Sequence, residues 1–215
     1  MAEIVEIGIC SRGSQGSGKV NLTGVILAAG ASSRLGRPKA LLTFRGETFL
    51  NRLLSHFFSV CGEVIVVVRP DQPLIETNAK ELHPKFVVNP KPELGMLSSL
   101  QCGLAAISPQ AEAVMFSPVD YAPVQRDTIQ QIVEAFNGIL TLPMYEGKRG
   151  HPCILSRQLT KELLELSVTA SAKTVIHAHL PDARLVAVKD QRTVEDVDDM
   201  AAYQRLLEIE GNVEN

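Results

Sequence analysis

The sequence lacks an excess of positive charge, a long apolar run and a basic beginning. Lys and Arg number 21 against 24 Asp and Glu, and the basic residues are scattered, so we expect no broad face for nucleic acid. No apolar run approaches the roughly 20 residues of a membrane span. Glu3 and Glu6 stand where a signal peptide would be basic. These absences favour a cytoplasmic protein with no nucleic-acid or membrane partner.

Cysteine is scarce as well, and its spacing excludes two classes of small protein. The four cysteines are far apart and form no Cys-x-x-Cys pair, so neither a metal knuckle nor a disulfide framework is predicted. We expect reduced, mostly buried thiols. With 45% hydrophobic residues in 215, the chain can bury a sizeable core without such cross-links.

The first 21 residues differ in composition from the rest. Gly13 to Lys19 matches the first seven positions of a P-loop, but Val20 stands where the magnesium-binding hydroxyl is needed and no amphipathic helix follows. We therefore interpret residues 1–21 as a flexible appendage and predict one domain over residues 22–215.

From residue 23 onward, apolar strands alternate with amphipathic helices. This order predicts a mainly parallel sheet in a three-layer α/β/α sandwich, a Rossmann-like fold whose ligands lie beyond the carboxyl ends of the strands. One helix is expected to end just before Gly62 and another at Gly138. A last helix should turn Met200, Tyr203 and Leu207 inward. The predicted strands are 24–29, 64–68, 85–88, 113–116 and 139–142.

The segment from Leu27 to Lys39 is the most informative in the chain. An apolar strand ends in a loop of small residues, which presents backbone N–H groups to an anion. Gly30 and Gly36 permit conformations closed to other residues, and Arg34 and Lys39 could neutralise a polyphosphate. A cationic surface turn is the alternative for any one of these residues, but the whole arrangement favours a phosphate-binding loop.

Three further segments carry candidate site residues. The run from Asn89 precedes a helix that opens near Met96, where Ser98 and Ser99 either contact a sugar or anion or cap the helix. Asp120 follows a predicted strand, and four acids lie between residues 195 and 199. Two such carboxylates beside a polyphosphate would suit Mg²⁺.

A fourth segment, Gly150-His151-Pro152, forms a tight turn in which His151 either hydrogen-bonds a substrate or packs on its own backbone.

Together these residues resemble the MobA-like nucleotidyltransferases. Leu27 to Lys39 is similar to the L-A-A-G-x-S-x-R-x-G-x-x-K motif, and Pro38-Lys39-Ala40-Leu41-Leu42 is most similar to the branch that makes the cytosine form of the molybdenum cofactor. Later motifs follow in the same order: Asn89-Pro90, Gly95-Met96-x-Ser98-Ser99-Leu100, Gly150-His151-Pro152 and Asp196-Val197-Asp198. The resemblance covers residues 23 to about 208.

The resemblance implies transfer of CMP from CTP to the phosphate of a molybdopterin-type acceptor, with release of pyrophosphate. Arg34, Lys39 and Asp120 would be catalytic, Asp120 and Asp198 would hold Mg²⁺, and Gly150 and His151 would contact the acceptor. A molybdenum hydroxylase would be a transient partner. The implied nucleotide-binding residues are Leu27, Ala28, Ala29, Gly30, Ala31, Ser32, Ser33, Arg34, Lys39, Asn89, Gly95, Ser98 and Ser99.

Two departures from the family pattern leave alternatives open. Ala122 stands where a proline is usual after Asp120, and Asp199-Met200 replaces Thr-Pro, so either Asp196 or Asp198 could be the second metal ligand. The rival functions are a guanylyltransferase for the same cofactor, a nucleotidyltransferase for a sugar phosphate or another small phosphate, and a non-catalytic cofactor carrier.

Overall fold

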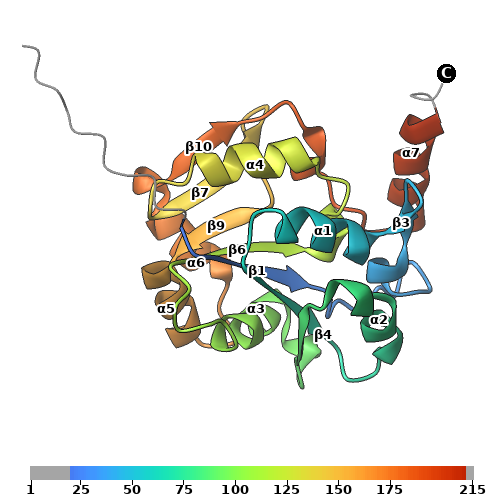
Figure 1. Cartoon of the computed structure of the whole chain (residues 1–215), viewed down its shortest axis with the longest axis horizontal. Helices are drawn as coiled ribbons and strands as arrows, with labels where there is room; N and C mark the ends of the chain where they lie inside the picture. The colour runs from blue at the N-terminus through green and yellow to red at the C-terminus, as the bar shows by residue number, and fades with distance from the viewer. Residues whose placement is uncertain (1–19, 212–215) are drawn as a thin grey trace, which may run out of the picture.

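A computed structural model describes residues 20–211, and the appendage predicted at the N-terminus lies almost wholly outside this range. One eight-stranded sheet forms the centre of the molecule (Figure 1). Its strands are β1 (Leu22–Leu27), β4 (Glu63–Val68), β5 (Lys85–Val88), β6 (Ala113–Pro118), β7 (Leu140–Tyr145), β8 (Lys148–Arg149), β9 (Cys153–Ser156) and β10 (Arg184–Ala187). A separate hairpin pairs β2 (Thr43–Phe44) with β3 (Glu47–Thr48).

The sheet is mainly parallel, as predicted. Its order is β10-β7-β9-β6-β1-β4-β5, with β8 paired to β7. Strand β9 runs antiparallel to both β6 and β7, and β8 runs antiparallel to β7. The remaining strands share one direction, so their carboxyl ends lie at one edge of the sheet.

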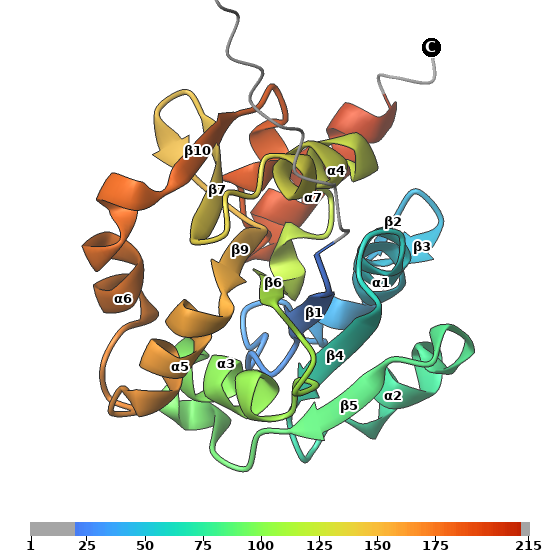
Figure 2. The same ribbon diagram turned by 60° about the vertical axis from the view of Figure 1, so that its left-hand side comes forward.

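Helices cover both faces of the sheet and complete the three predicted layers (Figure 2). They are α1 (Phe49–Phe58), α2 (Pro73–Asn78), α3 (Met96–Ala105), α4 (Arg126–Glu134), α5 (Arg157–Glu165), α6 (Ala172–Ala178) and α7 (Met200–Gly211). Short 3₁₀ turns are η1 (Lys39–Leu41), η2 (Lys80–Leu82), η3 (Pro92–Leu94), η4 (Val119–Tyr121), η5 (Leu180–Asp182) and η6 (Gln191–Thr193). Within residues 20–211, none of the helices has the length and apolar character needed to cross a membrane.

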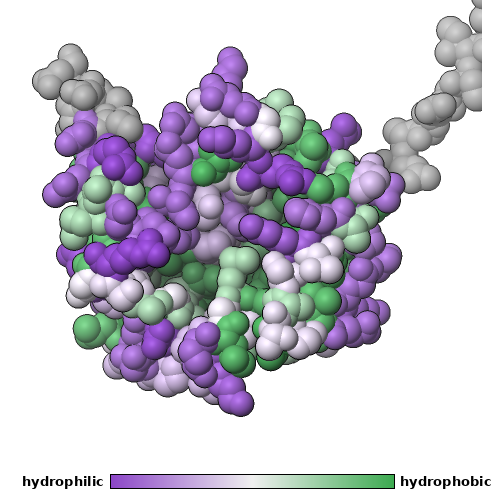
Figure 3. Space-filling view, turned by 180° about the vertical axis from the view of Figure 1, so that it is seen from behind, coloured by the Kyte–Doolittle hydropathy of each residue, from purple (hydrophilic) through white to green (hydrophobic). Residues whose placement is uncertain are grey.

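The core has two halves because neighbouring residues of a strand point to opposite faces. On β1, Ile26 packs with the helices α1, α4 and α7, whereas Val25 packs with α3, α5 and α6. Both side chains are fully buried. Hydrophilic residues cover much of the outer surface, and hydrophobic residues gather in a hollow near the middle of the face in Figure 3.

Local expectations were correct for most elements and wrong at some ends. Helices α1 and α4 end at Phe58 and Glu134, four residues before Gly62 and Gly138. On α7 the inward residues are Tyr203 and Leu206, while Met200 and Leu207 are exposed. None of the three cysteines that the structure describes forms a disulfide; Cys61 and Cys153 are buried and Cys102 is half-buried.

Candidate active site

A cleft of about 640 Å³ lies at the carboxyl edge of the sheet, where β1 and β6 end. Its walls come from six separate segments of the chain. The lining residues are Leu27, Ala28, Ala29, Gly30, Ala31, Ser32, Ser33, Arg34, Lys39, Pro92, Gly95, Met96, Ser99, Pro118, Val119, Asp120, Tyr121, His151, Lys173, Asp196 and Asp198. This is the position in which parallel α/β folds hold their ligands.

The loop that follows β1, residues 28–39, is held in shape by a few backbone contacts. Ser32 has a positive φ of 50° and its hydroxyl accepts a hydrogen bond of 3.0 Å from the backbone N–H of Lys39. Gly36 has a φ of 67°, the left-handed conformation that favours glycine. Gly30 has no positive φ, so the left-handed conformation that glycine permits is used at Gly36 and not at Gly30.

The same loop offers backbone donors to a ligand. The N–H of Ala28 donates to the carbonyl of Val67 and is therefore engaged in the fold. Within residues 20–211, the N–H groups of 29–33 have no protein acceptor. A Cβ on Gly30 would meet no atom within 4 Å, so this residue leaves open space in the cleft. Free donors beside open space can bind an anion.

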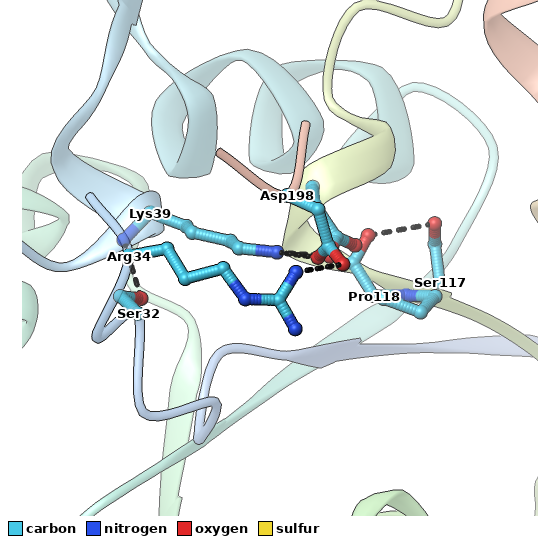
Figure 4. Close-up of polar contacts among 7 residues, drawn as sticks. Ser32, Arg34, Lys39, Ser117, Pro118 and Asp198 are labelled. Atoms are coloured by element: carbon cyan, nitrogen blue, oxygen red, sulfur yellow. Dashed lines mark hydrogen bonds and ion pairs between the residues drawn. The ribbon is translucent and has the colours of Figure 1, made fainter. Parts of the chain in front are cut away.

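Two cations of the loop, Arg34 and Lys39, point toward Asp198 (Figure 4). The Lys39 ammonium donates to Asp120 Oδ2 at 2.8 Å and to Asp198 Oδ1 at 2.5 Å. The Arg34 guanidinium lies 3.4 Å from Asp198 Oδ2. The structure thus brings together four residues that lie as far as 164 positions apart in the sequence.

The pKa values of Lys39, Asp120 and Asp198 are shifted in the site. Burial alone would lower the pKa of Lys39, but Asp120 and Asp198 outweigh it and raise that pKa. Burial raises the pKa of Asp120, Asp196 adds to this rise, and Lys39 offsets it only in part. The hydrogen bond from Lys39 lowers the pKa of Asp198, which Arg34 lowers further.

Three carboxylates form a cluster that fits a divalent metal. Asp120, Asp196 and Asp198, here called the carboxylate cluster, offer oxygens that all lie within 4.8 Å of one another. The Oδ1 atom of Asp120 is buried and has no hydrogen-bond partner among residues 20–211, which leaves it available as a ligand. Oxygen donors of this kind suit Mg²⁺ or Mn²⁺. Both candidates for the second acid therefore lie at the site.

The segment before α3 is fixed to the start of that helix by hydrogen bonds. The buried amide of Asn89 donates to the hydroxyls of Ser98 and Ser99, at 2.7 and 2.9 Å. Its carbonyl accepts from the backbone of Lys91. Ser99 and Gly95 line the cleft, whereas Asn89 and Ser98 lie outside the lining. Asn89 and Ser98 fix the start of α3 through these hydrogen bonds, and their expected contact with a nucleotide stays a prediction.

The turn at residues 150–152 places His151 in the cleft and Gly150 outside its lining. The His151 ring packs against Phe116 and Tyr121, with centroid distances of 5.3 and 4.7 Å. Burial lowers the pKa of His151 to about 4, so its imidazole is neutral near pH 7. Gly150 approaches the backbone of Thr193 too closely for a larger residue, and its expected contact with the acceptor stays a prediction.

Sequence reasoning missed several residues that line the cleft, among them Met96, Tyr121 and Lys173. Met96 directly follows Gly95 and Tyr121 directly follows Asp120. This adjacency in sequence could have indicated that both residues lie at the cleft. Lys173 lies on α6, which no motif marked. It is exposed, and within residues 20–211 its ammonium makes no ion pair with a carboxylate.

Three curated relatives are named for different activities. Nicotine blue oxidoreductase of Paenarthrobacter nicotinovorans is 29% identical over 197 residues, 86% of this chain and 96% of that one. Molybdenum cofactor cytidylyltransferase of Escherichia coli is 25% identical and covers 86% and 97% of the two chains. Probable molybdenum cofactor guanylyltransferase of Methanosarcina acetivorans is 30% identical over 67% of each chain. These relatives do not resolve a single substrate.

Solved structures share the fold at similar identity. Rv0371c of Mycobacterium tuberculosis H37Rv is 29% identical with a TM-score of 0.78, and covers 88% of this chain and 98% of that one. A complex of Rv0371c with manganese has a TM-score of 0.74 at 27% identity, with 88% and 99% covered. A divalent metal is therefore held by a protein of this fold.

The family of the chain follows from a match that covers most of its length. The MobA-like NTP transferase domain matches residues 24–183, which include the 28–39 loop, the start of α3, Asp120 and the turn at His151. The carboxylates at residues 196 and 198 lie beyond the matched range, and the fold brings them back to the cleft. The chain belongs to the MobA-like NTP transferase domain family.

Proposed function

We propose that this protein transfers CMP from CTP to the phosphate of a molybdopterin-type acceptor, forming a cytosine dinucleotide and releasing pyrophosphate. One observation carries the proposal. A loop with free N–H groups, Arg34 and Lys39 faces the carboxylate cluster across a single cleft. This arrangement combines donors for a triphosphate with acids for a divalent metal.

The residues of the chain position and neutralise the reactants. An oxygen of the acceptor phosphate attacks the α-phosphorus of CTP, and the bond to the bridging oxygen of the β-phosphate breaks as pyrophosphate leaves. The attacking oxygen is already anionic, so no general base is required. Lys39 and Arg34 stabilise the charge that develops on the phosphates, and the N–H groups of residues 29–33 bind their oxygens.

Metal binding is assigned to the carboxylate cluster, with Asp120, Asp196 and Asp198 as the candidate ligands. A bound Mg²⁺ supplies charge neutralisation and orientation of the triphosphate. Homology to a protein whose structure contains manganese supports a divalent ion here.

The acceptor is assigned to the wall formed by His151, Tyr121 and Met96, and Lys173 is a further cation in the lining of the same cleft. The neutral imidazole of His151 can donate or accept a hydrogen bond without adding charge. Choice of CTP rests on the resemblance of Ala28-Ala29-Gly30 and Pro38-Lys39 to the cytidylyl branch.

A guanylyl transfer to the same acceptor is the second candidate, favoured by the relative that is 30% identical. Pyrophosphate release measured with each of the four NTPs, with and without molybdopterin, separates the two. We expect acceptor-dependent release with the highest kcat/KM for CTP. A higher kcat/KM for GTP would establish the second candidate instead.

The relative named as an oxidoreductase calls for a control in the same assay series. Oxidation of NADH and NADPH is followed optically with the same protein preparation. Steady oxidation of either cofactor together with no pyrophosphate release from any NTP would overturn the transferase proposal.

A further inference from the structure

The acids that suit a metal are already engaged by cations of the protein. The Lys39 ammonium lies between two members of the carboxylate cluster, at 2.8 Å from Asp120 and 2.5 Å from Asp198. The second oxygen of Asp198 faces Arg34 at 3.4 Å. Both oxygens of Asp198 thus have a cationic partner, and Figure 4 shows Lys39 and Arg34 converging on this one carboxylate.

A metal on these oxygens would crowd the ammonium. Mg²⁺ and similar ions bind oxygen at about 2.1 Å, so an ion on the oxygens that Lys39 now contacts would lie within about 5 Å of its nitrogen. Two cations at that distance repel each other strongly in a partly buried site. A metal that uses Asp198 must therefore displace one of its present partners.

Lys39 is the partner that can move without disturbing the loop. Its backbone N–H is fixed to the Ser32 hydroxyl at 3.0 Å, while the side chain has four rotatable bonds. The free N–H groups of residues 29–33 line the same cleft, so a triphosphate bound there offers the ammonium a new anionic partner.

We propose that Lys39 and the divalent metal occupy the carboxylate cluster in turn: Lys39 in the free protein, and the metal once a triphosphate draws the lysine away. The inference rests on the proposed function, because it takes an NTP as the ligand. The cluster then has weak affinity for free metal and takes the metal together with the triphosphate.

Alternate occupancy couples the two ligands. A triphosphate that removes Lys39 from Asp120 and Asp198 strengthens metal binding, and by thermodynamic reciprocity the metal strengthens triphosphate binding by the same factor. Much of the coupling has its origin in one side chain, so replacing that side chain should reduce it.

The first experiment measures Mn²⁺ binding by electron paramagnetic resonance with no nucleotide present. Lys39→Met should bind Mn²⁺ about 10-fold more tightly than the wild-type protein, because the competing charge is removed. Lys173→Met is the matched control: it removes the same charge from the same cleft lining but breaks no ion pair of the cluster. It should stay within about threefold of wild type. Melting curves verify that both variants are folded.

The second experiment uses the wild-type protein alone and stays informative even if Lys39→Met fails to fold. Its affinity for Mn²⁺ is compared with and without a non-hydrolysable CTP analogue, and we expect a gain of about 10-fold or more with the analogue. In Lys39→Met this gain should fall to about threefold or less.

Equal or weaker Mn²⁺ binding by Lys39→Met would overturn the inference, since the metal would then bind beside the lysine, for example on the orphaned Oδ1 of Asp120. Failure of the proposed function looks different. Tighter Mn²⁺ binding by Lys39→Met, together with no turnover of any NTP by the wild-type protein, would remove the transferase proposal and leave alternate occupancy standing.

Discussion

Gly150 is a residue whose side chain could not be larger without moving the backbone. A Cβ at this position would lie 1.9 Å from the carbonyl oxygen of Thr193, which itself accepts a hydrogen bond of 2.7 Å from His151. The close approach joins the turn at residues 150–152 to η6, which follows Asp190.

Gly150→Ala should therefore destabilise the protein by about 3 kcal/mol or more, because the clash is with backbone and not with a flexible side chain. Urea unfolding gives the free energy. Gly30→Ala is the control, since its Cβ would meet no atom within 4 Å, and it should change the free energy of unfolding by less than about 1 kcal/mol. A Gly150→Ala protein as stable as wild type would show that the two backbones do not meet in solution.

His56 gives the stability a pH dependence that its position in α1 explains. The ring is buried, Nδ1 has no partner among residues 20–211, and burial together with Arg52 and Arg126 lowers its pKa to about 4. In the unfolded chain a histidine has a pKa of about 6.5. Between these values the unfolded state binds more protons, so stability is complete above about pH 6.5 and falls as the pH drops toward 4.

The change His56→Gln should remove part of this dependence. Urea unfolding at pH 7.5 and pH 5.0 should show a loss of stability on acidification that is smaller in His56→Gln than in wild type by about 1 to 2 kcal/mol. His151 titrates in both proteins in the same direction and cancels in the comparison. An identical acid loss in the two proteins would mean that His56 does not stay neutral in the fold.

At the scale of residues, the sequence predicted which residue types lie at the cleft better than the contacts that each of them makes. Arg34, Lys39, Asp120 and Asp198 meet as the motifs indicated. Motif spacing carries no information on burial, however, so it could not show that the amide of Asn89 is buried and donates to Ser98. Nor could it show that a lysine fills the place where the acids converge.

At the scale of elements, α7 holds the late acids in position. Its first turn follows the segment that carries Asp196 and Asp198, and Tyr203 ties it to the hairpin. The Tyr203 hydroxyl donates to the carbonyl of Thr43 at 2.7 Å and accepts from its N–H at 3.3 Å. The ring packs edge-on against Phe49 at 6.1 Å. In Figure 1, α7 stands beside β3 at one end of the molecule.

Tyr203→Phe should loosen this attachment while keeping the ring. Loss of the contacts between the Tyr203 hydroxyl and Thr43 should cost about 1 kcal/mol, because Thr43 is exposed and water can replace part of the lost hydrogen bonding. Mn²⁺ binding in the presence of the CTP analogue should weaken, since Asp198 depends on α7 for its position. Leu207→Ala, an exposed change on the same helix, is the control and should affect neither measurement. Unchanged Mn²⁺ binding in Tyr203→Phe would show that the acids are positioned independently of α7.

Elements with a strong apolar pattern were predictable and their ends were not. The run 64–68 is buried on both faces of the sheet and its position in β4 was correct. Helix α4 stops at Glu134 although the apolar spacing continues to Phe136, because Phe136 packs against the core from the following turn. The antiparallel direction of β9 also escaped prediction, since residue alternation is the same for either direction of pairing.

At the scale of the whole molecule, the parallel sheet separates two edges with different uses. The carboxyl edge carries the cleft, including Leu27 at the end of β1. At the amino edge, Asn21 precedes β1, and its N–H donates to Glu112 while its side chain donates to the carbonyl of Gln110. Six residues of strand span about 20 Å, so the chain enters the domain far from the cleft.

This separation predicts that the P-loop-like segment has no part in nucleotide binding. Gly13 to Lys19 lies outside the described residues, and Val20 lacks the hydroxyl that such a loop needs for magnesium. A protein that begins at Asn21 keeps the contacts with Glu112 and Gln110, so it should melt within about 2 °C of the full chain and bind the CTP analogue within about twofold. Calorimetry measures binding of the CTP analogue, and thermal melting measures stability. The control is Lys19→Ala in the full chain, because Lys19 is the cation of the Gly13 to Lys19 segment that a phosphate would contact. Loss of CTP binding in both the shortened protein and Lys19→Ala would assign nucleotide binding to that segment; loss in the shortened protein alone would show that residues 1–20 support the domain in another way.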